Sequence, residues 1–266
     1  MIPSTPLSLL GVLPFVRLPA GIGPIHPFGV LVALGVALGF RLASRRARTL
    51  GLDLPRFESH VTWTVVTGFV LSHVLDTIAY HPEVILRRPW ELLLIYQGLS
   101  SFGGFLGGVV GFLAYARRHR VDAWRSADAI AYGLPVGWLF GRMGCASIHD
   151  HPGARSLSPF AVDWPGGPRF DLGLLELMLV PLLILGVALV ARRTTRPGAL
   201  ITTLALMYPP IRFPLDFLRA SAADGGDVRY FGFTPGQYAA VALFAVGLGL
   251  LVTGRRRERA DQPAEA

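Results

Sequence analysis

The segment 173-GLLELMLVPLLILGVALVA-191 contains one charged residue, Glu176, and is followed directly by Arg192 and Arg193. The hydrocarbon core of a bilayer is about 30 Å thick and a helix rises about 1.5 Å per residue, so about 20 apolar residues cross it. This segment has that length and composition. It is therefore predicted to be a transmembrane helix, and it sets the pattern for the rest of the chain.

Other apolar runs of similar length occur along the chain, each bounded by arginine, proline or polar residues. With 52% of its 266 residues hydrophobic and only 16% charged, the chain has too little charge for a soluble surface. We therefore predict an all-α, polytopic membrane protein with about seven transmembrane helices. The predicted spans are 27–44, 61–80, 92–115, 128–146, 173–191, 199–218 and 235–253.

Arginine supplies all 25 basic side chains, and the net charge is +8. The arginines cluster after every second predicted span and are sparser in the alternate connections. Cytoplasmic loops carry such an excess, so the N-terminus is predicted outside the cytoplasm and the C-terminus inside. We attribute this distribution of arginines to membrane topology, and no nucleic-acid partner is expected. The clusters include Arg45, Arg46, Arg117, Arg118, Arg192, Arg193, Arg255, Arg256 and Arg257.

A single transmembrane domain is predicted over residues 1–254, with a disordered cytoplasmic tail over 255–266. No basic region precedes the first apolar run, so no cleaved signal peptide is expected. No internal repeat is visible, which makes a transporter less favoured. The only cysteine, Cys145, excludes an intramolecular disulfide and a zinc site of several cysteines.

Two arginines lie within predicted spans, where a charge is costly and seldom idle. Arg142 stands among glycines in 141-GRMGC-145, and its planar guanidinium matches a phosphate group. Snorkelling of Arg142 to the outer headgroups is the alternative. Arg212 shares a helix face with Asp216, four residues on, so it is a second candidate for ligand contact. Asp216 either contacts the ligand itself or only orients Arg212.

The stretch 149-HDHPG-153 follows the arginine-bearing span. Its adjacent side chains rarely converge on one ion, so we predict no metal site. A histidine beside Asp150 is suited to act as a general base, although a turn of satisfied polar residues is an equal alternative. His149 and His151 would point in different directions, so only one is expected to face a pocket. His149 is favoured, because Pro152 is expected to hold His151 in an extended turn that faces solvent.

Polar residues at other predicted span ends are further candidates. His26 opens the first span and Glu176 lies in the fifth, both near the predicted outer face. In the third span Gly103 and Gly107 have the spacing of a helix-packing face, which is favoured over a phosphate loop.

These residues resemble the prolipoprotein diacylglyceryl transferases of bacterial inner membranes, from His26 through Gly236-Gln237. The segment from Gly141-Arg142 to Asp150 and Gly153 is similar to the family signature G-R-x-G-N-F-x-N-x-E-x-x-G. The segment from Arg212-Phe213 to Arg219 is similar to R-F-x-x-E-F-x-R.

The resemblance implies transfer of diacylglyceryl from phosphatidylglycerol to the lipobox cysteine of a prolipoprotein signal peptide, without a cofactor or metal. The partners implied are phosphatidylglycerol, the prolipoprotein and membrane lipid, in a multi-pass protein of the bacterial inner membrane. Such a reaction needs cations for the phosphate and a group that takes the thiol proton. The catalytic candidates are Arg142, Arg212, His149, His151 and Asp150, and the substrate-binding candidates are Arg142, Arg212, Arg219, His26, Asp216, Gly153 and Glu176.

The sequence departs from the family pattern at several positions. Cys145 stands in place of the signature asparagine, Asp150 in place of the glutamate, and Phe28 in place of a common tyrosine. The histidine of the family's S-F-H-G-G segment is missing from 100-SSFGG-104. His149 and His151 are the predicted replacements for this proton acceptor. The alternative is a non-catalytic relative that binds a lipid or a lipoprotein signal segment.

Overall fold

The computed structural model of the protein describes residues 13–16, 26–80, 87–88, 90, 92 and 100–261. This part of the chain is mostly helical, so the prediction of an all-α polytopic protein is confirmed. Its α-helices are α1 (Pro27–Thr49), α2 (Leu54–Tyr80), α4 (Ser101–His119), α5 (Ala123–Ile148), α6 (Leu172–Arg193), α7 (Ala199–Leu215) and α8 (Pro235–Asp261). The strands are β1 (Pro152–Arg155), β2 (Ala161–Val162) and β3 (Arg169–Asp171).

The predicted spans coincide with these helices, and the differences lie at the ends. Helices α1 and α8 continue past the apolar runs into arginine-rich sequence, because long charged side chains reach water from a helix end. Helix α7 is shorter than predicted: Pro209, Pro210 and Pro214 each lack a backbone donor, and the chain continues as the 3-10 helix η3 (Asp216–Leu218). The predicted third span, 92–115, includes residues 93–99, which lie outside the described part, and α4 covers its remainder from Ser101.

Four of the described helices are long and apolar enough to cross a membrane: α1, α2 over Leu54–Ile78, α6, and α8 over Pro235–Gly254. Helix α7 has only 17 residues, and α5 carries charged residues that include Arg142. The single-domain boundaries at 254 and 255 stay a prediction, since α8 is described as far as Asp261.

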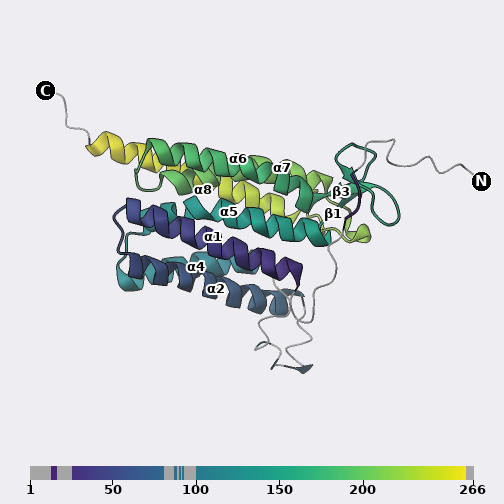
Figure 1. The fold of residues 1–266 in the computed structure, drawn as a ribbon, viewed down its shortest axis with the longest axis horizontal. Coiled ribbons are helices and arrows are strands. Elements are labelled where there is room, and N and C mark those ends of the chain that lie inside the picture. Colours follow the sequence, from purple (N-terminus) through teal and green to yellow (C-terminus); the bar gives the residue numbers. More distant parts are fainter. Residues whose placement is uncertain are drawn as a thin grey trace, which may run out of the picture. The chain divides into compact units, whose positions relative to one another are not determined.

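The chain divides into two compact units, one of residues 1–43 and 131–266 and the other of residues 44–130. In the first unit α7 packs against both α6 and α8 (Figure 1). Helices α1 and α5 approach closely through glycines, because a Cβ on Gly133 would lie 2.1 Å from the Gly39 carbonyl oxygen. Small residues of this kind let helix backbones pack together in membranes.

In the second unit α2 packs against α4. A Cβ on Gly103 would lie 2.8 Å from the Leu71 carbonyl oxygen, and one on Gly107 would lie 2.6 Å from that of Thr67. The predicted role of these glycines as a helix-packing face is therefore confirmed. The hydroxyl of Ser100 caps α4 by accepting from the Gly103 backbone N–H.

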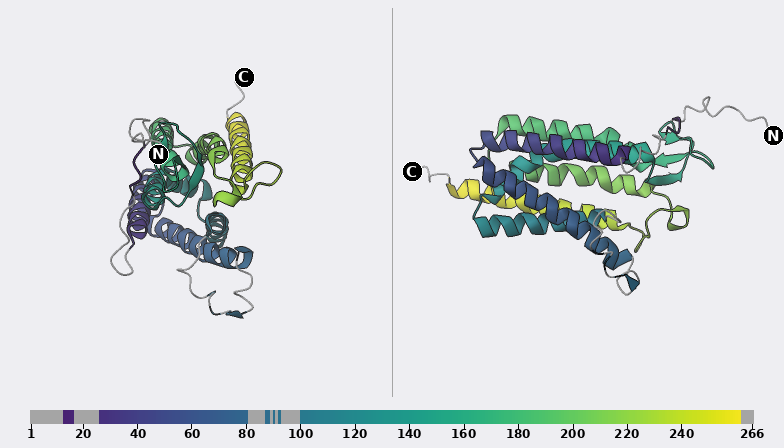
Figure 2. Two further views of the ribbon diagram at one scale, coloured as in Figure 1. Left: turned by 90° about the vertical axis from the view of Figure 1, so that its right-hand side faces the viewer. Right: turned by 60° about the horizontal axis from the view of Figure 1, so that its bottom comes forward.

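The connection between α5 and α6 forms a three-stranded antiparallel sheet in the order β1-β3-β2. It lies at the end of the first unit where α6 begins, opposite the C-terminal end of α8 (Figure 2). Strand β1 also contacts the chain beyond α7, since Ala220 N donates to the Pro152 carbonyl at 3.2 Å. Gly153 is required there: a Cβ would lie 2.6 Å from Phe170 Cβ and 2.8 Å from the Leu218 carbonyl oxygen.

Candidate active site

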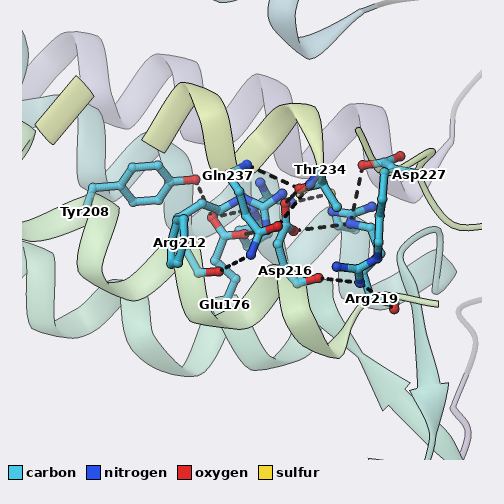
Figure 3. A network of polar contacts seen from close by, with 12 residues as sticks. Glu176, Tyr208, Arg212, Asp216, Arg219, Asp227, Thr234 and Gln237 are labelled. Carbon is cyan, nitrogen blue, oxygen red and sulfur yellow. Dashed lines mark hydrogen bonds and ion pairs between the residues drawn. The ribbon is translucent and has the colours of Figure 1, made fainter. Parts of the chain in front are cut away.

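Glu176, in the second turn of α6, joins the two arginines that the sequence singles out. Its side chain is only 1% exposed. Arg142 Nε from α5 lies 3.2 Å from Glu176 Oε1, and Arg212 Nη1 from α7 lies 3.9 Å from Oε2 (Figure 3). The structure therefore brings Arg142, Arg212 and Glu176 together at the end of the helices that carries the sheet.

Two uncharged donors complete the environment of the Glu176 carboxylate. Trp138 Nε1 and Tyr208 Oη each donate to Oε1 at 3.0 Å. The Arg142 guanidinium also lies over the Trp138 ring, 5.6 Å from its centroid. A buried carboxylate surrounded by this many donors holds its neighbours in place.

Asp216 is the centre of a second, adjoining group of contacts. It is fully buried at the C-terminal end of α7, with Oδ1 2.6 Å from Arg212 Nη1 and 3.2 Å from Arg219 Nε. The Thr234 hydroxyl donates to Asp216 Oδ2, and Arg229 Nη2 donates to the Asp216 backbone carbonyl at 3.1 Å (Figure 3). Asp216 thus orients Arg212, as one of the two sequence readings proposed, and it also fixes Arg219.

The start of α8 closes this group through a capping box. Thr234 N donates to Gln237 Oε1 at 3.0 Å, and Gln237 N donates back to Thr234 Oγ1 at 3.2 Å, with Pro235 at the first helical position. Gly236 has no room for a side chain, since a Cβ would lie 2.5 Å from Asp216 Oδ2. The Gly236-Gln237 motif is therefore needed to seat α8 against the Arg212–Asp216 pair.

Among the most buried groups of the cluster, guanidinium groups outnumber carboxylates. Arg142, Arg212 and Arg219 have side chains that are 17%, 13% and 10% exposed, and the buried carboxylates facing them are those of Glu176 and Asp216. Two further carboxylates are more exposed: Asp227, at 47%, lies 3.4 Å from Arg219, and Asp150, at 34%, interacts electrostatically with Arg142. Buried charges need partners, so among the described residues this arrangement favours an anion as the missing partner.

His149 lies in a separate aromatic pocket. It ends α5 with a φ of +54°, and its Nδ1 lies 2.5 Å from Asp171 Oδ2 while its Nε2 lies 3.2 Å from the Val16 carbonyl oxygen. Its ring stacks on Phe15 with 4.2 Å between centroids. Both ring nitrogens face hydrogen-bond acceptors, so neither is free to take a substrate proton. The assignment of His149 as the base stays a prediction, and these contacts do not favour it.

His151 is the histidine that feels the arginine cluster. Burial, together with repulsion from Arg142, Arg219 and Arg212, lowers the pKa of His151 to about 4. Its ring is uncharged at neutral pH and keeps a lone pair. Burial also raises the pKa of the neighbouring Asp150, which lies 3.7 Å from His151 Nδ1. The prediction that only one of the two histidines faces the pocket agrees with this geometry.

The candidate residues still to be placed are Gly153 and His26. Gly153 is buried where β1 meets the chain after α7, so its contribution is to backbone packing. His26 is exposed just before α1, and none of the described contacts brings its side chain to the cluster. The sequence reading missed Trp138, Tyr208, Arg229 and Thr234. A signal existed for two of them, because an aromatic residue stands four positions before each intramembrane arginine.

These features define a class: a polytopic helical membrane protein with a buried arginine–carboxylate cluster at one end of its helices. Residues 16–253 match the family model described as prolipoprotein diacylglyceryl transferase. The chain belongs to this family, and the resemblance noted in the sequence is confirmed.

Curated relatives carry the name phosphatidylglycerol–prolipoprotein diacylglyceryl transferase. The protein of Thermus thermophilus is 38% identical over 155 residues, which cover 56% of this chain and 54% of the relative. That of Chromohalobacter salexigens is 28% identical over 253 residues, covering 92% and 94%. That of Nitratidesulfovibrio vulgaris is 30% identical over 253 residues, covering 91% and 94%. The similarity to the last two therefore extends over nearly the whole chain.

Proposed function

We propose that this protein transfers the diacylglyceryl group of phosphatidylglycerol to the lipobox cysteine of prolipoproteins at the outer face of the bacterial inner membrane. The observation that carries the proposal is the excess of buried guanidinium groups around Glu176 and Asp216. Membership of the transferase family supports the same reading. A buried group of arginines suits the phosphate of a lipid headgroup.

In this reaction the thiolate sulfur attacks the glyceryl carbon that carries the phosphate. A carbon–sulfur bond forms, the carbon–oxygen bond breaks, and the electron pair leaves on glycerol phosphate. Arg142 and Arg212 stabilise the charge that grows on the leaving phosphate. Glu176 and Asp216 hold the two guanidinium groups before substrate arrives, so no reorganisation is needed in the transition state.

Glu176 acts as a positioning residue. Its Oε1 already accepts from Arg142, Trp138 and Tyr208. The thiol proton therefore needs another acceptor, and we assign it to His151, with Asp150 beside it. An unperturbed thiol has a pKa of about 8.5, so a base at the site raises the thiolate fraction at neutral pH.

The role of His151 predicts a pH dependence. Protonated His151 takes up no proton, so the rate falls as pH drops through its pKa. That pKa is about 4, because the ring is buried and lies in the field of Arg142, Arg219 and Arg212. Bound phosphate offsets their charge, so the acid limb of kcat should lie at higher pH than that of kcat/KM, which reports the free enzyme. His151→Ala should slow transfer about 100-fold or more and remove the difference between the two profiles.

The matched controls are His149→Ala and His26→Ala, assayed on a lipobox peptide from about pH 3 to 8, a range that includes the His151 pKa of about 4. The His26 variant should keep the wild-type pH profile. The His149 variant is expected to lower thermal stability, through Asp171, and to keep the shape of the profile. A His151→Ala protein with the wild-type rate and profile would assign the proton to a carboxylate, to water or to the substrate phosphate.

The orientation is tested by reporter fusions. A reporter after Arg118 or Arg257 is expected to give cytoplasmic signal, and one near Gly166 periplasmic signal. The reason is the arginine bias, which predicts that the arginine-poor connections, including the one between α5 and α6, lie outside the cytoplasm. Arg192 and Arg193 end α6 at its opposite end from the sheet, which supports this orientation. Cytoplasmic signal at Gly166 would place the arginine cluster on the side away from lipobox cysteines.

Complementation of a transferase-depleted strain separates the enzyme from a non-catalytic binder. Growth, together with a mobility shift of a lipobox peptide given phosphatidylglycerol, is the expected result. The observation that favours a non-catalytic binder is the absence of the family's histidine from the segment 100-SSFGG-104. Binding of the peptide or lipid without growth or product would establish that alternative.

A further inference from the structure

Three different metal-ligand side chains meet beside the arginine cluster. The ligand atoms of Cys145, Asp150 and His151 all lie within 4.8 Å of one another. Cys145 is in the last turn of α5, and the positive φ of His149 ends that helix. The chain then turns back, so Asp150 and His151 lie next to Cys145 although they are five and six positions further along.

This cluster differs from the one considered in the sequence. The three adjacent residues 149–151 were not expected to converge on one ion, and in the structure His149 faces Asp171. Cys145, in the last turn of α5, provides the third ligand atom in place of His149. The result is a thiol, an imidazole and a carboxylate, the three ligand types that zinc uses, with the fourth tetrahedral position left to water.

We propose that Cys145, Asp150 and His151 bind a thiophilic divalent cation such as Zn²⁺, and that this ion inhibits the enzyme. Binding forms a metal–sulfur bond and releases the thiol proton to solvent. One thiolate and one carboxylate balance the two charges of the ion, so the bound complex adds no net charge beside the arginines. Hard ions such as Mg²⁺ lack affinity for thiolate, so they should not bind here.

Inhibition follows from the position of the cluster. Arg142 Nη1 lies 3.9 Å from Cys145 Sγ, so the ion would lie next to the arginine assigned to the phosphate. It would also occupy Asp150 and His151, which hold the thiol proton in the proposed reaction. This second step rests on the proposed function, whereas the binding itself does not.

Binding is tested on the full-length protein in detergent by titration with Cd²⁺, whose bond to thiolate gives an ultraviolet charge-transfer band. Wild-type protein should show the band with one equivalent of Cd²⁺, and Zn²⁺ should displace it. Asp150→Asn and His151→Ala keep the thiol but each remove one ligand. Each should weaken Cd²⁺ binding by at least about tenfold, since loss of even an outer-shell partner costs about 10- to 100-fold. His119→Ala, which changes an exposed histidine of α4, is the control and should leave the affinity unchanged.

The outcomes separate the two proposals. No band in the wild type, or a band whose affinity is unchanged in both ligand variants, refutes the metal site even if transfer is active. A band with the expected losses supports the site even if transfer is absent. In an active preparation, micromolar Zn²⁺ should lower the transfer rate and Mg²⁺ should not, with each variant compared with its own metal-free rate. Zn²⁺ sensitivity that persists in Cys145→Ala would refute inhibition through this cluster.

Discussion

Replacing Arg142 or Arg212 by alanine is expected to lower diacylglyceryl transfer by about 100- to 1,000-fold. Loss of one preorganised donor to a developing oxyanion typically has this effect, about 2.7 to 4 kcal/mol in the barrier. Each guanidinium is already held by a buried carboxylate, Glu176 or Asp216. The measurement is the initial rate of lipobox-peptide modification with phosphatidylglycerol.

Lysine at position 142 should restore little of this activity. The Arg142 guanidinium contacts Glu176 through Nε and lies over Trp138, and an ammonium group cannot reproduce the fork or the stacking. Arg155→Ala is the matched control, because Arg155 is exposed in β1 at the same end of the protein. Full activity in a folded Arg142→Ala protein would remove Arg142 from the phosphate site.

Replacing Asp216 by alanine is expected to cause the largest loss of stability. Asp216 pairs with Arg212 and Arg219, accepts from Thr234 and is fully buried, so the change removes the nearest carboxylate of two guanidinium groups. Breaking a buried ion pair by removing one partner costs about 3 to 5 kcal/mol. Thermal unfolding of the purified protein in detergent is the measurement, and the transition should move to markedly lower temperature.

The control for Asp216 is Asp227→Ala. Asp227 contacts the same arginine, Arg219, at 3.4 Å, but its side chain is 47% exposed. Exposed ion pairs contribute about 1 kcal/mol or less, so this variant should unfold close to the wild type. Equal transitions for the two variants would show that burial of Asp216 is not the source of its contribution.

The membrane architecture was predictable because it depends on local composition. A run such as 173–191 identifies a span by itself, since the bilayer rewards apolar length wherever it occurs in a chain. Arg142 and Arg212 were found for the same reason, because a charge inside an apolar run is visible without knowing its neighbours. The helix ends were less well predicted, because residues such as the prolines at the end of α7 decide them.

The Asp216 partner of Arg212 was predictable from its spacing of four residues, whereas the shared partner Glu176 was not, because it comes from a different helix. Glu176 was only a polar residue near a predicted outer face, yet it joins α5 to α7. The roles of the histidines depended on one dihedral angle: with φ at +54°, His149 turns to Asp171 while His151 turns toward the arginines. In the sequence, the turn expected at Pro152 had favoured His149 instead.

The sequence by itself determined the class of protein, the family and the two cations on which the proposed chemistry depends, since each is carried by a contiguous segment. Tertiary structure alone decided that Glu176 and Asp216 hold those cations, that His151 lies in their field, and that Cys145 meets Asp150 and His151. The physical reason is that buried charges are satisfied across helices, by partners far apart in the chain, whereas membrane spanning is satisfied within each helix.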